Sequence, residues 1–318
     1  MSKADALLKR RSLMVLNRFL EATPSRTPSL LMTLFGDTVV AHGVEIWLGS
    51  LVRLLEPLGI SERLVRTSVY RLAQDNWIEG VKSGRRSYYR LTASAKAEVL
   101  HTDRRIYYHS ERQWDGQWRL VFTGTRGINT DQRTHLHKRL TRMGFGVIAP
   151  NVYGHPTAPV ETVWNTFADM GIAERVVVMR AENFDHTRGL QPREMARQCF
   201  TLETLEQEYE NFIERYRPLA TAIEKGAETS GLEPGQCFAL RTLLVHHYRR
   251  ILLRDPDLPV PLLPDKWVGT RARRLCGLLY RAMLSESEKF IQSMGETRDG
   301  RFTGIERGYR DRFPPAES

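Results

Sequence analysis

The segment Ser61–Gln74 constrains the fold more than any other part of the chain. At 100° per residue, Val65, Val69 and Leu72 lie on one side of a helix and form an apolar stripe. The opposite side carries six polar residues within about 140° of arc: Arg63, Arg66, Thr67, Tyr70, Arg71 and Gln74. This arc holds three arginines and no acidic residue. A helix divided in this way packs on one side and presents unopposed positive charge on the other.

The segments around this helix place it third in a series. Apolar residues recur at helical spacing over 29–40 and 44–55, and Pro57-Leu58-Gly59 then breaks the chain before Ser61, which can cap the third helix. Two strand-like runs follow at 77–81 and 87–91, and Thr92 can cap a further helix that runs to about Tyr107. This order predicts a winged helix-turn-helix domain over residues 29–110.

Both basic segments of this domain have residues suited to DNA. Arginine donates to guanine O6 and N7 and to phosphate, and threonine can contact the thymine methyl group. In the turn at 82–86, Gly84 permits a tight hairpin whose basic tip would approach flanking phosphates or the minor groove. The predicted hairpin contacts are Lys82, Arg85, Arg86 and Tyr88. The alternatives are an ordinary solvated helix face and a turn that is merely soluble.

The distribution of charge supports a polyanionic partner for the N-terminal part. The formal charge of +10 arises entirely in the first 180 residues: residues 1–100 carry 15 Lys and Arg against 9 Asp and Glu, and residues 101–180 carry 11 against 7. Residues 181–318 carry 21 of each sign. Arginine contributes 39 of the 47 cations, and its planar fork suits phosphates and base edges.

Other compositional features exclude several classes of protein. No run approaches 18 apolar residues, which excludes a membrane-spanning helix, and we expect a cytoplasmic protein. The cysteines, Cys199, Cys237 and Cys276, are odd in number and widely spaced, which argues against disulfides or a zinc site and predicts buried apolar residues.

The rest of the chain divides into four further segments, which make the whole an α+β multidomain protein. The prolines near residue 28 predict a flexible arm over 1–28. Alternating strand and helix patterns predict a ferredoxin-like α+β domain over 111–183. Residues 184–294 are predicted to form an all-helical domain, with helices at 204–225, 235–254 and 267–294. A Gly-, Arg- and Pro-rich tail at 295–318 is predicted to be disordered.

A proline-rich segment, 254–267, separates the last two predicted helices. Its four prolines favour a stiff extended connection. The alternative is one wall of a ligand site, because apolar and cationic side chains together suit a molecule with an apolar end and phosphates. The candidate ligand-binding residues are Arg250, Arg254, Trp267, Arg271 and Arg274.

Motifs for catalysis are missing from the sequence. It has no GxxxxGK[ST], no GxGxxG after a strand, no GxSxG and no HExxH. His135 and His137 lie about 200° apart on their predicted helix and cannot share a metal, and the adjacent pair His246-His247 is interpreted as structural. We therefore predict no catalytic residues, no metal, no cofactor and no enzymatic activity.

Several short runs, taken together, resemble the PaaX-type transcriptional repressors of phenylacetic acid degradation. They are Leu34-Phe35-Gly36-Asp37, Trp47-Leu48-Gly49, 65–72, 84–91 and 254–267, and their order and spacing match over most of the chain. The resemblance implies a winged helix, a central domain similar to the small ferredoxin-like nucleases of CRISPR adaptation, and a helical C-terminal domain. It also implies a homodimer that binds operator DNA and is released by phenylacetyl-coenzyme A.

We accordingly predict a repressor of a phenylacetic acid catabolic operon, released from double-stranded operator DNA by an aryl-acyl-CoA effector such as phenylacetyl-CoA. Two alternatives remain open. A winged-helix module for non-specific nucleic-acid or protein interaction would bind with salt-dependent but sequence-blind affinity. A metal-dependent nuclease would need at least two clustered carboxylates for a divalent ion, and the central strands carry few.

Overall fold

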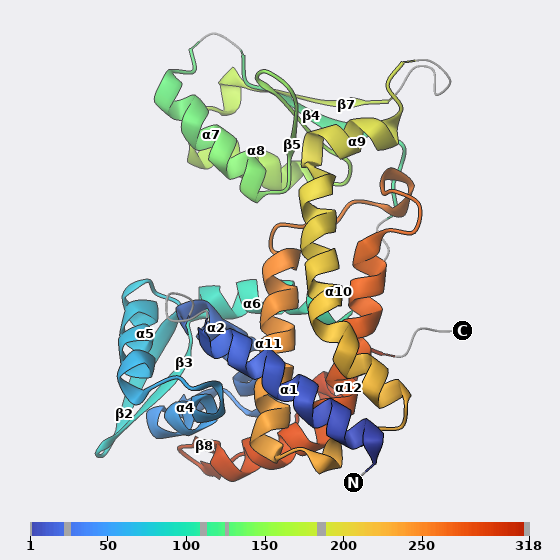
Figure 1. Cartoon of the computed structure of the whole chain (residues 1–318). Coiled ribbons are helices and arrows are strands. Elements are labelled where there is room, and N and C mark those ends of the chain that lie inside the picture. The colour runs from blue at the N-terminus through green and yellow to red at the C-terminus, as the bar shows by residue number, and fades with distance from the viewer. Residues whose placement is uncertain (1, 22–26, 109–112, 125–126, 183–188, 315–318) are drawn as a thin grey trace. The chain divides into compact units, whose positions relative to one another are not determined.

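The computed structural model describes residues 2–21, 27–108, 113–124, 127–182 and 189–314. The chain forms two compact units, shown in Figure 1. The first unit comprises Met1–His109, Glu210–Leu253 and Thr270–Ser318, and the second comprises Ser110–Tyr209 and Arg254–Gly269. Segments from both ends of the sequence therefore share the first unit. The chain has mixed α and β structure with a helical C-terminal region, as predicted.

The first unit contains the predicted helical series with one change. A continuous helical stretch consists of α2 (Thr27–Leu34), a π-helical turn η1 (Phe35–Val39) and α3 (Val40–His42). The predicted helix at 44–55 begins instead with a strand, β1 (Glu45–Trp47), and continues as α4 (Leu48–Leu55). The helical spacing of this segment concealed the strand because β1 is only three residues long. A 3₁₀ turn, η2 (Glu56–Leu58), ends at Gly59.

The third helix and the hairpin match the sequence prediction. Ser61 caps α5 (Glu62–Gln74) by accepting from the Leu64 amide, and Thr92 caps α6 (Ala93–Tyr107) by accepting from the Ala95 amide. The hairpin consists of β2 (Ile78–Ser83) and β3 (Arg86–Leu91), joined through Gly84 at a φ of 58°. Strand β1 pairs antiparallel with β3 on its other side, so the sheet order is β1-β3-β2.

The predicted flexible arm is wrong for the described residues of 1–28. Residues Lys3–Glu21 form a helix, α1, which buries Leu8, Leu16 and Phe19 and contacts α11 (Pro234–Leu252). The Glu228 amide also donates to the Asp5 carboxylate at 3.1 Å. The apolar residues of this segment recur on one face, and this periodicity outweighs the prolines near residue 28, which lie beyond the end of the helix.

Long helices form the rest of the first unit. The predicted helices correspond to α10 (Leu202–Glu224), α11 and α12 (Val268–Met294), with a 3₁₀ turn η4 (Thr229–Gly231) between the first two. Residues Glu210–Glu224 of α10 belong to this unit. Phe238 of α11 packs against Phe290 of α12 with ring centroids 5.3 Å apart. Cys237 and Cys276 are buried, as predicted, whereas Cys199 in the second unit is only partly buried.

The tail at 295–318 is also structured where it is described. It forms β8 (Glu296–Thr297), β9 (Gly300–Arg301) and a 3₁₀ turn η6 (Arg307–Tyr309). Phe302, Arg312 and Phe313 are buried, which explains why a Gly- and Arg-rich segment is ordered: its apolar and charged side chains have partners in the first unit. Residues 315–318 lie outside the described part of the chain.

The second unit contains a four-stranded antiparallel sheet. Its elements are β4 (Trp118–Phe122), α7 (Thr130–Arg142), β5 (Gly146–Ala149), β6 (Val152–His155), α8 (Val160–Asp169), a 3₁₀ turn η3 (Ala173–Arg175) and β7 (Val177–Ala181). The sheet order β5-β6-β4-β7 is the ferredoxin-like arrangement of a βαββαβ unit. The sequence analysis missed β6, which follows β5 after a turn at Asn151 with a φ of 61°.

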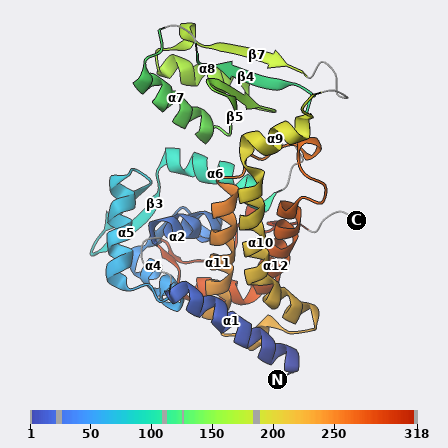
Figure 2. The same cartoon turned by 45° about the horizontal axis from the view of Figure 1, so that its top comes forward.

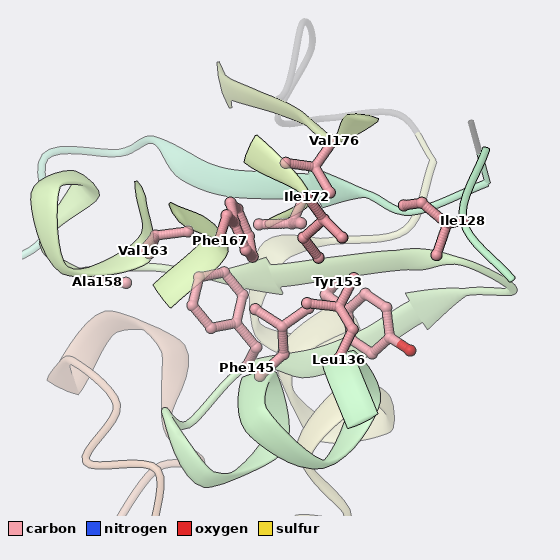
Figure 3. Packing of buried hydrophobic residues seen from close by; sticks show 11 residues of the cluster. Ile128, Leu136, Phe145, Tyr153, Ala158, Val163, Phe167, Ile172 and Val176 are labelled. Atoms are coloured by element: carbon pink, nitrogen blue, oxygen red, sulfur yellow. The ribbon is translucent and has the colours of Figure 1, made fainter. Parts of the chain in front are cut away.

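The core of this unit lies between the sheet and its two helices, as Figure 3 shows. Leu136 from α7 and Phe167 from α8 pack against Val121 of β4 and Tyr153 of β6. Helix α9 (Pro192–Phe200) contacts β5 and places the Phe200 ring on Trp118. This arrangement explains the strand and helix alternation of the sequence.

The proline-rich segment packs within the second unit. It includes a 3₁₀ turn, η5 (Val260–Leu262), whose Leu262 is fully buried. Asp265 pairs with Arg193 of α9 at 2.9 Å, and Tyr209 of α10 donates to Asp255 at 2.6 Å. These contacts fit the predicted stiff connection.

Candidate nucleic-acid interface

Helix α5 presents the predicted polar face to solvent. Val65, Val69 and Leu72 are buried in the first unit, and α5 contacts α2 and α4. Figures 1 and 2 show α5 at the left of this unit beside the β2–β3 hairpin. The six predicted contact residues are all exposed: Arg63, Arg66, Thr67, Tyr70, Arg71 and Gln74. Tyr70 is 66% exposed, which is unusual for a large aromatic side chain.

One arginine of this face has an acidic partner that the sequence analysis overlooked. Arg66 pairs with Glu62 one turn earlier, with Nη2 and Oε1 2.7 Å apart. Both side chains are 58% exposed, so the pair is a surface i, i+4 pair of small energy. The face is therefore not free of acidic neighbours, although Arg66 remains accessible to an anion.

The hairpin residues divide into two groups. Lys82 and Arg85, at the tip, are exposed as predicted. Tyr88, however, is only 5% exposed and points into the first unit, so the predicted contact of Tyr88 with DNA is wrong. Strand alternation explains the difference, because Tyr88 lies opposite Trp47 of β1 and shares that face of the sheet with Arg86.

Arg86, the first residue of β3 after the turn, has partners within the first unit. Its Nη1 donates to Oε2 of Glu296 at 2.9 Å, and its guanidinium lies 4.3 Å from the centroid of the Trp47 ring. The same carboxylate accepts from Arg53 at 2.8 Å. Hydrogen bonds from Arg53 and Arg86 lower the pKa of Glu296 below its usual range. Arg86 is thus engaged with Glu296 while its side chain stays 51% exposed, and its contact with DNA stays a prediction.

The sequence analysis missed Glu296, although a signal for it was present. Asp299-Gly300 is a strong hairpin dipeptide. Arg298 and Asp299 form the turn between β8 and β9, and Gly300 begins β9 with a φ of 128°. The segment was interpreted as a disordered tail from its composition. Local turn chemistry is here more informative than composition over the whole segment.

A second cluster of charges in the first unit is buried. Arg312 donates to Asp103 Oδ2 at 3.1 Å and to the Gly36 carbonyl at 2.8 Å, and its guanidinium lies 4.1 Å from the Tyr107 ring centroid. It also contacts the carboxylate of Asp37 at 3.3 Å. Gly36 and Asp37 belong to the π-helical turn, in which the ordinary i to i+4 hydrogen bonding is interrupted and carbonyls can accept from other groups.

Arg241 completes this cluster. It lies 3.2 Å from Asp37 and donates to Glu288 at 2.9 Å, and Glu288 in turn is 2.6 Å from Nε2 of His42. Arg241 is 1% exposed. A buried charge is tolerated only where partners of opposite sign and hydrogen bonds surround it. These contacts join η1, α3 and α6 to α11 and α12.

The two carboxylates that share Arg312 titrate differently. Burial by itself would raise the pKa of Asp37, but Arg241 and Arg312, together with hydroxyl donors from Tyr107 and Tyr280, hold it below its usual range. Burial raises the pKa of Asp103 to about 7, with Arg312 opposing the shift and Asp37 adding to it. Asp37 is therefore the charged member of the pair at pH 6, and Asp103 is largely protonated.

Comparison with known proteins decides the family. Family models match residues 26–95 as PaaX-like protein, 111–196 as the PaaX protein central Cas2-like domain and 200–293 as the PaaX-like protein C-terminal domain. Transcriptional repressor PaaX of Escherichia coli (strain K12) is 33% identical over 313 residues, which cover 98% of this chain and 95% of the relative. The chain belongs to the PaaX family. Its membership confirms the resemblance inferred from the motifs and supports transcriptional repression as its function.

A solved structure shares the fold of this PaaX-family chain. The uncharacterized protein Rv0674 from Mycobacterium tuberculosis matches with a TM-score of 0.54 and 20% identity, covering 82% of this chain and 97% of that chain. At this identity the likeness concerns the fold alone.

The candidate ligand residues are distributed over both units of the PaaX-family chain. Arg250, Arg271 and Arg274 belong to the first unit, and Arg254 and Trp267 belong to the second. Arg254 pairs with Glu208, and Trp267 packs edge-on against Tyr209 with centroids 6.0 Å apart. Arg271 and Arg274 are exposed on α12. A common ligand site formed by these residues stays a prediction.

The described residues contain no group of three or more His, Cys, Asp or Glu side chains placed to hold a metal ion. His137 lies 3.1 Å from the Tyr153 hydroxyl, and His246 lies 3.0 Å from that of Thr33.

None of the helices in the described ranges combines the length and the apolar character needed to cross a membrane.

Proposed function

We propose that this chain represses a phenylacetic acid catabolic operon by binding its operator DNA. The observation that supports this function most strongly is the exposed cationic face of α5 in a chain that matches a transcriptional repressor over nearly its whole length. A cationic helix face beside a basic hairpin suits the phosphates and base edges of a major groove.

Residues 27–107 act in this proposal as a winged helix-turn-helix. Helix α5 enters the major groove, where Arg63, Arg66 and Arg71 donate to base edges or phosphates. Thr67, Tyr70 and Gln74 supply apolar contacts and further hydrogen bonds. Lys82 and Arg85 bind the adjacent backbone. Phosphate contacts position the protein, whereas contacts to base edges select the sequence.

The repressor acts as a homodimer. Two α5 helices related by twofold symmetry would read two half-sites separated by about one helical turn or a multiple of it. The operator is accordingly expected to be a palindrome or a near-palindrome.

An aryl-acyl-CoA such as phenylacetyl-CoA releases the repressor. The effector must bind more tightly to a state that cannot engage both half-sites, because only differential affinity shifts the equilibrium. The candidate binding residues are Arg250, Arg254, Trp267, Arg271 and Arg274. Arginines suit the phosphates of coenzyme A, and an indole ring suits the aryl group.

A titration tests this function. Labelled duplex from the promoter of a phenylacetate degradation operon is bound by the full chain and challenged separately with phenylacetate and with phenylacetyl-CoA. We expect release by the thioester and none by the free acid. Equal affinity for this duplex and for an unrelated duplex would contradict operator recognition.

We also propose that the chain has no catalytic activity of its own. Incubation of DNA and RNA with the protein and Mg²⁺ or Mn²⁺ tests this point directly. Cleavage that depends on the divalent ion would favour the nuclease alternative for the central unit.

A further inference from the structure

Residues 295–313, which we call the C-terminal strap, follow α12. The strap contacts residues 27–107, the proposed DNA-binding half of the first unit. Phe302 stacks on His42 with ring centroids 5.3 Å apart, and the Glu306 amide donates to the Ala41 carbonyl at 2.8 Å. Arg312 ends in the buried charge cluster, and the Phe313 amide donates to the Tyr107 carbonyl at 3.2 Å. The strap is thus anchored at several points along its length.

Near its start the strap contacts the sheet that carries the basic hairpin. Glu296 binds Arg53 of α4 through one carboxylate oxygen and Arg86 of β3 through the other, at 2.8 and 2.9 Å. Both guanidinium groups lie against the ring of Trp47 in β1, at 5.2 and 4.3 Å from its centroid. One carboxylate therefore joins three elements of the DNA-binding half.

A second pair fixes the register of this contact. Arg298, two residues after Glu296, pairs with Glu45 of β1, whose side chain is only 8% exposed. The strap thus offers an acidic and then a basic residue to a basic and an acidic residue on the sheet. A shift of the strap along the sheet would place like charges together, which disfavours alternative positions.

The geometry points to Glu296 as a positioning residue for the basic hairpin: it holds β3 against α4, so that the hairpin tip meets the DNA backbone while α5 lies in the groove. This inference rests on the proposed function. Arg86 acts as the link between Glu296 and the tip residue Arg85, which precedes it in the chain. The pairs of Glu296 with Arg53 and Arg86, and of Arg298 with Glu45, hold Glu296 in place. Little side-chain freedom therefore remains to be lost when DNA binds.

Glu296 could instead compete with DNA phosphates for its arginine partners, and its removal would then have a different effect on DNA binding. If Glu296 only competed with phosphate for Arg53 and Arg86, its removal would free two cations and strengthen binding to every DNA sequence. If it positions the hairpin, removal weakens binding to the selected sequence, because sequence-specific docking depends on geometry. Affinity for unrelated DNA depends chiefly on charge, so it should change only as much as in a variant that loses the same charge elsewhere on the strap.

The test compares Glu296→Gln with Glu306→Gln in the full-length protein. Glu306 lies on the same strap with an exposed side chain, so this control removes the same charge. The probes are the tightest-binding duplex that the unmodified protein selects from a randomised library and an unrelated duplex of equal length. We expect Glu296→Gln to bind the selected duplex about fivefold more weakly. Its affinity for the unrelated duplex should match that of Glu306→Gln, and Glu306→Gln should not weaken binding to the selected duplex.

A double variant identifies the partner. Arg86→Gln is expected to weaken binding to the selected duplex by a similar factor, and the double variant Glu296→Gln/Arg86→Gln by no more than either single change, because both remove one interaction. Unchanged affinity of Glu296→Gln, tighter binding to both duplexes, or full additivity with Arg86→Gln would each overturn the inference.

Hydrogen–deuterium exchange without DNA keeps the inference testable if operator binding itself fails. We expect Glu296→Gln to speed amide exchange in β2 and β3, while α11 and α12 keep their protection. Unchanged exchange in the hairpin, or faster exchange throughout the first unit, would contradict a local positioning role. Failure of the unmodified protein to select any duplex would instead count against the proposed function.

Discussion

The first unit uses arginine in two opposite ways. Arg312 is 4% exposed and contacts two carboxylates, two backbone carbonyls and two aromatic rings. Arg66 on α5 has a 58% exposed side chain and a single carboxylate partner on its own helix. The same residue type therefore serves as a fixed internal connection in one region and as an accessible donor in the other.

This difference shows why net charge alone does not identify a binding surface. A buried arginine is stabilising only while all its partners are present, because an unpaired buried charge is costly. An exposed pair contributes little to stability, so its arginine can exchange a carboxylate for a phosphate at small cost. Substitutions in the two regions should consequently separate effects on folding from effects on DNA binding.

The largest effect is expected from Arg312→Met. This change leaves Asp103 without its nearest cation and weakens the support of Asp37, and it should lower the free energy of unfolding by about 3–5 kcal/mol. Chemical denaturation of the free protein measures this loss. Arg310→Met, two residues away and exposed, should change stability by less than about 0.5 kcal/mol. Equal stability of the two variants would show that the buried cluster does not hold the strap.

The pH dependence of stability probes the same cluster through Asp103. Because its pKa is raised from the usual 3.8 to about 7, the folded state binds more protons than the unfolded state between these values. The contribution of Asp103 to stability is therefore complete below pH of about 4 and is lost as the pH rises through about 7, by up to about 1.4 kcal/mol per pH unit.

The variant Asp103→Asn isolates this contribution. Its free energy of unfolding, measured across the same pH range, should lack the decline that the unmodified protein shows, while other carboxylates affect both proteins equally. Asp311→Asn, which removes an exposed carboxylate next to Arg312 in the chain, should retain the decline. Parallel pH profiles for Asp103→Asn and the unmodified protein would count against a protonated Asp103.

At the exposed surface, Arg66→Ala tests the reading role of α5. If Arg66 contacts a base, operator binding should weaken by about 1–3 kcal/mol, whereas stability should change by less than about 0.5 kcal/mol. Titration of labelled operator and denaturation of the free protein measure the two quantities. An unchanged operator affinity would mean that α5 is not the helix that reads the operator. Arg66 would then differ from Arg312 only in burial and not in a role in DNA binding.

The parts of this surface that the sequence predicts correctly are those set by signals within a few residues. The cap at Ser61, the apolar stripe of α5 and the Gly84 turn act over a few residues, and the structure confirms each of them. The strand alternation of the central unit likewise predicts three of its four strands. Exposure of the α5 face follows directly from the same periodicity.

Several of the misses share a physical cause, which is long-range pairing. Glu296 and Arg86 are 210 residues apart, and Arg312 and Asp103 are 209 apart, so no local pattern links them. For the same reason the sequence analysis treated Tyr88 as exposed and 295–318 as disordered. Strand β1 was missed because its three residues form a strand through pairing with β3.

The smallest effect is expected at the hairpin tip, from Arg85→Ala. A contact with a single phosphate should weaken binding by about 0.5–1 kcal/mol, and equally for operator and unrelated DNA, because phosphates carry no sequence information. The slope of the logarithm of affinity against the logarithm of salt concentration should become shallower by about 1. Titrations of both duplexes at several salt concentrations give these values.

Lys225→Ala, which removes an exposed cation just after α10, is the matched control and should leave the salt slope unchanged. A loss confined to the operator would mean that Arg85 reads a base in the minor groove. The hairpin would then share sequence recognition with α5. Exposed arginines would in that case differ among themselves in whether they read bases or bind phosphates, in addition to differing from the buried arginines that stabilise the fold.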